Sequence, residues 1–169
     1  NFEALNGFIN IKLIDSFLWN SGQAFFKDGF DYPKKNTSVL LEYVSANPTG
    51  PLHIGHGRWA VLGQSLASLL AVVGYDVKTE FYINDAGNQI KSFRASVDAA
   101  RAGQAIPEDG YHGAYIKDLA ESEEDPLEAM LSAQKKTLAQ IHVNFDTWYS
   151  EKSLYANDKV EAGLQALKD

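Results

Sequence analysis

Apolar and polar residues alternate in one early stretch of the chain, whereas a later stretch is apolar almost throughout. Residues 7–14, GFINIKLI, set isoleucine and leucine against Asn10 and Lys12, which predicts a half-exposed strand. Residues 39–44, VLLEYV, are typical of a strand covered on both faces in a parallel sheet. Glu42 is the exception in that run, because a buried carboxylate needs a partner.

A long uncharged stretch follows. Residues 59–75 carry no charge but are interrupted by glycine, glutamine and serine, which predicts a buried helix rather than a membrane span. Large apolar residues recur there at helical spacing and predict one apolar face on a helix over residues 56–73: Trp59, Leu62, Leu66, Leu69, Leu70 and Val73. Residues 75–83, YDVKTEFYI, predict a second strand. A strand, a helix and a strand in about 45 residues predict a βαβ unit with a parallel sheet.

The rest of the chain shows helical periodicity broken by turn residues. Helices are predicted from residue 15 or 16 to 27, at 90–101, at 112–121, from 126 onward and from 157 or 158 onward, with a strand at 145–149. Residues 84–89, NDAGNQ, predict a polar turn, and residues 121–125, ESEED, a solvated connection. Residues 31–37, DYPKKNT, predict a linker after a small front piece.

Composition narrows the class of protein. The chain has 169 residues, of which 45% are hydrophobic and 22% charged, as in a globular domain. Its net charge of −7 argues against a broad basic surface for nucleic acid. It has no cysteine, which excludes disulfides and thiolate metal sites and suits the cytosol. No secretory signal is visible. Because the chain begins at Asn1 and its only methionine is Met130, we expect a piece of a longer protein.

The segment with the strongest chemical signal is residues 47–57, NPTGPLHIGHG. It lies between the carboxyl end of the first predicted parallel strand and the start of the predicted helix, where ligands bind in such folds. Free N–H groups and the helix dipole attract phosphate at that place. Its three glycines, Gly50, Gly55 and Gly57, allow a nucleotide to approach the backbone.

Two histidines stand in the same segment. His53 and His56 are three residues apart, so both rings can face a common ligand, and ring N–H donors can stabilise charge on a phosphate. The segment matches neither a Walker loop nor a dinucleotide fingerprint. No third ligand accompanies the histidines, and we therefore predict no metal site on the chain.

The residues His53-Ile54-Gly55-His56 are identical to the HIGH signature of class I aminoacyl-tRNA synthetases. Residues 42–58 resemble the corresponding block of bacterial arginyl-tRNA synthetases. Two later segments, FYINDAGNQI at 81–90 and FDTWYSEKSLY at 145–155, are similar to further blocks of that family. The resemblance is sharp over residues 38–101 and 141–155, looser before residue 38 and weak over 102–140.

This resemblance implies an α/β fold, the first half of a class I synthetase Rossmann-like nucleotide-binding fold with a parallel sheet. Residues 1–30 would be the C-terminal end of an N-terminal tRNA-binding domain, 31–37 a linker, and 38–169 a partial catalytic domain with an insertion. The implied activity is that of an arginine-tRNA ligase, which forms arginyl-adenylate from arginine and ATP with Mg²⁺ and passes arginine to tRNA(Arg).

The resemblance also implies roles for individual residues. His53 and His56 would be catalytic. The ATP-binding residues would be Thr49, Gly50, His53, Gly55, His56 and Gly57. The arginine-binding residues would be Glu42, Ser45, Asn47 and His53. Four further polar residues could shape the site: Asn84, Asp85, Asn88 and Gln89.

Some parts of that family's pattern are not found in this sequence. It shows neither a KMSKS-like lysine loop nor a helical anticodon-binding domain, so we expect the chain alone to be inactive and most contacts to tRNA(Arg) to lie outside it. The expected location is the cytoplasm, with no membrane contact. Two alternatives remain open here: another HIGH-type nucleotidyl transferase, and a noncatalytic binding module that retains the loop.

Overall fold

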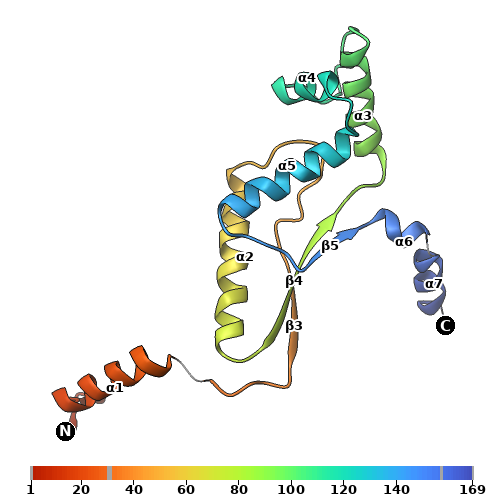
Figure 1. The fold of residues 1–169 in the computed structure, drawn as a ribbon. Coiled ribbons are helices and arrows are strands. Elements are labelled where there is room, and N and C mark those ends of the chain that lie inside the picture. Colours follow the sequence, from red (N-terminus) through yellow and green to blue (C-terminus); the bar gives the residue numbers. More distant parts are fainter. Residues whose placement is uncertain (1, 30–31, 157, 169) are drawn as a thin grey trace.

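The computed structural model describes residues 2–29, 32–156 and 158–168. The elements in chain order are β1 (Phe2–Leu5), β2 (Phe8–Ile11), α1 (Asp15–Asp28), β3 (Ser38–Glu42), α2 (Ile54–Val72), β4 (Asp76–Ile83), α3 (Asn88–Arg101), α4 (Ala114–Glu121), α5 (Pro126–Gln140), β5 (Thr147–Ser150), α6 (Lys152–Ala156) and α7 (Lys159–Ala166). Figure 1 labels the elements from α1 onward. The predicted final helix is confirmed as α7, while residue 157 lies outside the described residues. Among the described residues, no helix has both the length and the apolar character needed to cross a bilayer.

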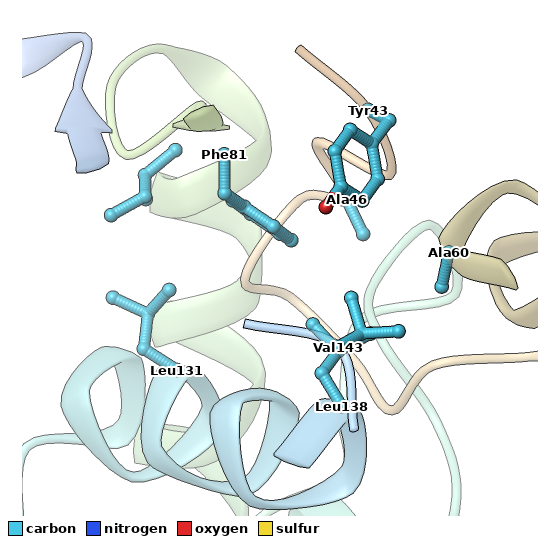
Figure 2. Packing of buried hydrophobic residues seen from close by; sticks show 8 residues of the cluster. Tyr43, Ala46, Ala60, Phe81, Leu131, Leu138 and Val143 are labelled. Carbon is cyan, nitrogen blue, oxygen red and sulfur yellow. The ribbon is translucent and has the colours of Figure 1, made fainter. Parts of the chain in front are cut away.

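The main sheet has three parallel strands in the order β3-β4-β5. The predicted βαβ unit is confirmed, because β3 pairs with β4 in parallel and α2 connects them. A buried cluster covers one face of this sheet and draws side chains from β4, α2 and α5. Figure 2 shows Phe81 of β4, Ala60 of α2, and Leu131 and Leu138 of α5 converging there. This packing holds the carboxyl ends of the strands in place relative to α2 and α5.

The prediction that β3 is covered on both faces is wrong for the described residues. Exposure alternates along the strand, and Leu40 is 61% exposed while Leu41 packs against the core. The core cluster lies on one face of the sheet, so the face that carries Leu40 and Glu42 is open to solvent. Glu42 therefore needs no buried partner.

The predicted apolar face of α2 is also wrong. Its buried residues are Ala60 and Ala67, whereas most of the large side chains on the predicted face are exposed, with Trp59 at 61% and Leu69 at 64%. Leu70 and Val73 are half-buried. The reason is the close approach of α2 to the chain that leaves β3. A Cβ at Gly63 would lie 2.2 Å from Cγ of Tyr43, so only small residues fit on that side.

A second buried cluster joins α3, α4 and α5 through Phe93, Val97, Ile116 and Met130. Asp125 links α5 to α3. Its carboxylate accepts hydrogen bonds from the N–H groups of Leu127 and Glu128 and thereby caps α5. The same carboxylate forms a forked ion pair with Arg94, at 2.6 and 3.1 Å. The helices α3, α4 and α5 thus form one packed unit.

The described side chains of the front piece are exposed, and only Gly22 among its described residues is half-buried. β1 and β2 pair as an antiparallel hairpin, and α1 has no buried residue among its described side chains. α1 ends at Gly29 with φ of 70°, as predicted. The described part of the predicted linker, residues 32–37, has no helix or strand. It is attached to the sheet domain where Lys35 N–H donates to the Gly74 carbonyl at 2.7 Å.

Candidate active site at the carboxyl end of β3

The chain leaves β3 through two residues in the left-handed region, Val44 with φ of 68° and Ser45 with φ of 41°. A branched side chain there is strained, at roughly 1–3 kcal/mol, and persists only where surrounding contacts impose it. Ser45 supplies such contacts. Its hydroxyl donates to the Glu42 carboxylate at 2.7 Å and accepts from the Tyr82 N–H at 3.1 Å. Two predicted arginine-binding residues, Glu42 and Ser45, are therefore hydrogen-bonded to each other.

Side chains from α3, α4 and α5 hold the next part of the loop. The Gln134 amide donates to the carbonyls of Asn47, at 3.1 Å, and Gly50, at 2.9 Å. The Tyr115 hydroxyl donates to the Thr49 carbonyl at 3.0 Å. The Asn47 side-chain amide donates to Gln89 Oε1 at 2.5 Å. Asn47 is thereby fixed at both its backbone and its side chain.

Gln134 and Tyr115 were not predicted from the sequence as residues of the site. Gln134 is 1% exposed and lies on the buried face of α5 with Met130, Leu131 and Leu138. A polar residue at helical spacing within an apolar stripe is the signal that could have revealed it. Tyr115 gives no comparable signal in the sequence.

The histidines form a reciprocal cap at the start of α2. His53 is the N-cap residue, and its Nδ1 accepts the Gly55 N–H at 3.1 Å. In return, the His53 N–H donates to Nδ1 of His56 at 3.2 Å. The two rings stack with their centroids 3.7 Å apart. Because each Nδ1 is an acceptor, each neutral ring carries its proton on Nε2, which leaves two Nε2–H donors at the helix N-terminus.

The protonation of His56 follows from this packing. Burial lowers its pKa, and the charge of His53 lowers it further. Neutral rings keep the cap intact, since protonation of Nδ1 would remove an acceptor. The lowered pKa of His56 favours its neutral ring, which offers an uncharged hydrogen-bond donor.

The three loop glycines differ in what surrounds them. A Cβ at Gly55 would lie 2.9 Å from Cε1 of His53, so the histidine cap itself requires glycine there. A Cβ at Gly50 would make an ordinary contact with the Tyr115 hydroxyl at 3.5 Å, and one at Gly57 would meet nothing within 4 Å. Gly57 leaves an open surface beside the histidines, which a ligand could approach.

The four predicted site-shaping residues separate in the structure. Gln89 contacts Asn47, as described above. The Asp85 carboxylate accepts hydrogen bonds from the Ser150 hydroxyl at 2.5 Å and from the Lys152 N–H at 2.9 Å. It therefore ties the turn after β4 to the end of β5 and the start of α6. Asn84 is half-buried just after β4, and Asn88 is exposed at the first position of α3.

One hollow adjoins the loop, and another lies at the turn after β4. The first, of about 680 Å³, runs along the exposed side of α2 beside Gly55, Gly57 and Leu62 and is largely apolar. The second, of about 570 Å³, is lined by Asp85, Lys91 and Lys152 among others. Within residues 2–29, 32–156 and 158–168, no group of three or more metal-ligating side chains is assembled.

Comparison with known proteins identifies this arrangement. Residues 23–121 match the family described as tRNA synthetases class I (R), catalytic domain. Proteins named arginine–tRNA ligase from Synechococcus sp. (strain JA-3-3Ab) and Gloeobacter violaceus are each 42% identical over 96% of this chain. The chain spans about a third of the length of these curated relatives, 32% and 31% respectively.

Solved structures agree on the fold. A Campylobacter jejuni protein described as an arginyl-tRNA synthetase superposes with a TM-score of 0.76 at 39% identity, over 90% of this chain and 39% of its own. Thermus thermophilus arginyl-tRNA synthetase superposes with a TM-score of 0.73 over 99% of this chain and 32% of its own, and its 20% identity supports the fold alone. The predicted Rossmann-like fold is thus confirmed, and the chain belongs to the class I arginyl-tRNA synthetase catalytic-domain family.

Proposed function

We propose that this chain supplies the first half of the nucleotide-binding fold of an arginine-tRNA ligase, which joins arginine to ATP and then transfers it to tRNA(Arg). One observation carries the proposal. The stacked pair His53 and His56 presents two Nε2–H donors at the N-terminus of α2, at the carboxyl end of a parallel strand. That is where a parallel α/β sheet binds phosphate.

In the first step, the arginine carboxylate attacks the α-phosphorus of ATP, forming arginyl-adenylate while the bond to pyrophosphate breaks. Negative charge on the phosphate oxygens shifts during that step. His53 and His56 would donate hydrogen bonds to those oxygens, and because both rings are already fixed by the cap, little reorganisation is needed. Thr49, Gly50, Gly55 and Gly57 would form the surface on which the nucleotide lies.

The second substrate would lie on the open side of β3. Ser45 and Asn47 would hold the amino and carboxylate groups of arginine, with His53 beside them. Glu42 would face the guanidinium, because its carboxylate lies on the open face of the sheet. Glu80 is its register partner on β4 and shares that face, so two like charges stand together and a cation between them would relieve their repulsion.

The remaining requirements are part of the same proposal. Mg²⁺ would arrive with ATP, since it is commonly held by substrate phosphates rather than by a protein cage. Residues 1–30 would end an N-terminal tRNA-binding domain, 31–37 would be the linker and 38–169 a partial catalytic domain. Most tRNA contacts would lie outside this chain, which its net charge of −7 supports, and the enzyme would act in the cytoplasm.

The test is arginine-dependent exchange of pyrophosphate into ATP by the full-length enzyme with tRNA(Arg) present. His56→Glu is the informative variant, because glutamate at this position of a helix also accepts the N-cap N–H, removes the ring donor and adds a negative charge that repels phosphate. We expect exchange to fall at least about 10²–10³-fold, as when one transition-state donor is lost, with little change in melting temperature.

Exchange that proceeds equally with His56→Glu would contradict the role of the ring. Exchange stimulated by another amino acid, and not by arginine, would contradict the choice of substrate. The same assay on the 169-residue chain alone tests the expectation that these residues are not sufficient for activity.

A further inference from the structure

Gln134 is the most deeply buried amide near the loop, and its orientation is fixed by its acceptors. Its Nε2 lies 3.1 Å from the Asn47 carbonyl and 2.9 Å from the Gly50 carbonyl. Rotating the amide by half a turn would place Oε1 against two carbonyl oxygens, which is repulsive. Only an –NH₂ group satisfies both acceptors at once.

The other end of the same amide has no partner. Oε1 of Gln134 is buried and accepts no hydrogen bond among the described residues. A buried acceptor without a donor is costly, and a methionine or leucine of similar size would avoid that cost. Stability of the helix packing therefore does not by itself explain the choice of glutamine, whereas the pair of bonds to the loop does.

Tyr115 holds the carbonyl between these two contacts. Its hydroxyl donates to the Thr49 carbonyl at 3.0 Å, and its ring lies against Gly50. The loop has little capacity to hold itself, because Pro48 and Pro51 have no N–H group. The shape of residues 47–50 is therefore imposed from α4 and α5.

We propose that Gln134 and Tyr115 form a clamp that positions the loop for adenylate formation. This inference rests on the proposed function. Tyr115 lies within residues 23–121, which match the family model, whereas Gln134 lies beyond them. Both act through the loop residues that they contact. Asn47 carries the side chain that would meet arginine, and His53 follows Gly50 by three residues. Gln134 and Tyr115 are positioning residues, since neither would touch the reacting atoms.

The experiment compares Gln134→Met and Tyr115→Phe in the full-length enzyme with two matched controls. Met130→Ala opens a cavity on α5 in the second cluster, and Tyr111→Phe removes a hydroxyl from a tyrosine whose ring packs edge-on against Phe93. The readouts are kcat and KM for ATP in arginine-dependent exchange, and amide hydrogen–deuterium exchange of residues 49–57.

We expect Gln134→Met to lower kcat by roughly 10²-fold, the size of effect caused by a misplacement of about 1 Å, with a much smaller change in KM. Tyr115→Phe lowers kcat in the same direction but less, and both variants speed deuterium exchange in residues 49–57. Neither control does so, even where Met130→Ala lowers the melting temperature more.

Two results would overturn the clamp: clamp variants with wild-type kcat and wild-type deuterium exchange, or controls that lose kcat to the same extent at equal loss of stability. A full-length enzyme without arginine-dependent exchange would defeat the proposed function instead. In that case deuterium exchange in the loop still decides whether Gln134 and Tyr115 hold it.

Discussion

The two sides of α2 differ more than its sequence suggests. The side facing the sheet is built from Ala60, Gly63 and Ala67, and Gly63 leaves no room for a Cβ against the Tyr43 ring. The opposite side carries large apolar residues that remain exposed, among them Leu62 and Leu69. The helix is therefore apolar on both sides, and residue size rather than hydropathy distinguishes them.

This difference shows a limit of hydrophobic periodicity. The usual argument assigns the stripe with the largest apolar residues to the core. Here the helix lies so close to the chain leaving β3 that large side chains cannot enter, and the small residues at 60, 63 and 67 mark the buried side. In an uncharged helix, a stripe of alanine and glycine is the better guide.

The strongest test of this comparison is a methyl group on the buried side. Gly63→Ala would place Cβ 2.2 Å from Tyr43 Cγ, so the ring or the helix must move. Overpacking costs roughly 1–3 kcal/mol or more, and the better helix propensity of alanine returns about 1 kcal/mol. We expect a net loss of about 2 kcal/mol in the free energy of unfolding of the 169-residue chain, measured from urea titrations.

A double variant identifies the cause of that loss. In a Tyr43→Leu background, Gly63→Ala should cost at least about 0.5 kcal/mol less, because contacting residues couple by that amount or more. An identical cost in both backgrounds would mean that the Tyr43 ring is not what excludes the methyl group.

A smaller effect is expected at the start of the helix, where acid disturbs the histidine cap. The pKa of His56 is lowered in the folded protein, first by burial and then by the charge of His53. The unfolded chain binds the proton more readily, so this contribution to stability is full above the ordinary histidine pKa of about 6.5 and is lost as the pH falls below it.

We therefore expect the urea midpoint of the wild-type chain to fall on acidification below about pH 6.5. His56→Gln should reduce this dependence, because glutamine can accept the same N–H without titrating. A pH profile unchanged by His56→Gln would exclude the cap as its source.

The smallest effect is predicted on the exposed side of α2. Leu69 is 64% exposed, and Leu69→Ser should change the free energy of unfolding of the 169-residue chain by no more than about 0.5 kcal/mol. A loss as large as that of Gly63→Ala, measured in the same titrations, would show that this side is packed in solution and would remove the contrast between the two sides.

Much of the fold was predictable, because local signals and tertiary structure agree. The parallel βαβ unit, the turn after β4 and the proline start of α5 follow from periodicity and capping residues. β1 was missed, since its four residues give no periodic signal, and the strand predicted at 145–149 lies at Thr147–Ser150. Coverage of β3 could not be predicted, because it depends on which elements surround that strand.

The candidate site was predictable only where the chemistry is local. The spacing of His53 and His56 placed two rings on one turn, and the structure brings them into contact. The roles of these residues toward ATP and arginine stay predictions. Gln134 and Tyr115 could not be inferred to reach the loop, because the residues they contact lie 84 and 66 positions away along the chain.

The left-handed backbone at Val44 and Ser45, just after β3, limits how small a fragment can keep the geometry of this site. Val44 does not favour that conformation by itself; the Tyr82 N–H and the Glu42 carboxylate, both bound by the neighbouring Ser45, hold the bend in place. A synthetic peptide covering residues 38–57 would contain the whole motif but lose its geometry, because Tyr82 of β4 would be missing. Transplanting the motif into another scaffold would need the adjacent strand as well.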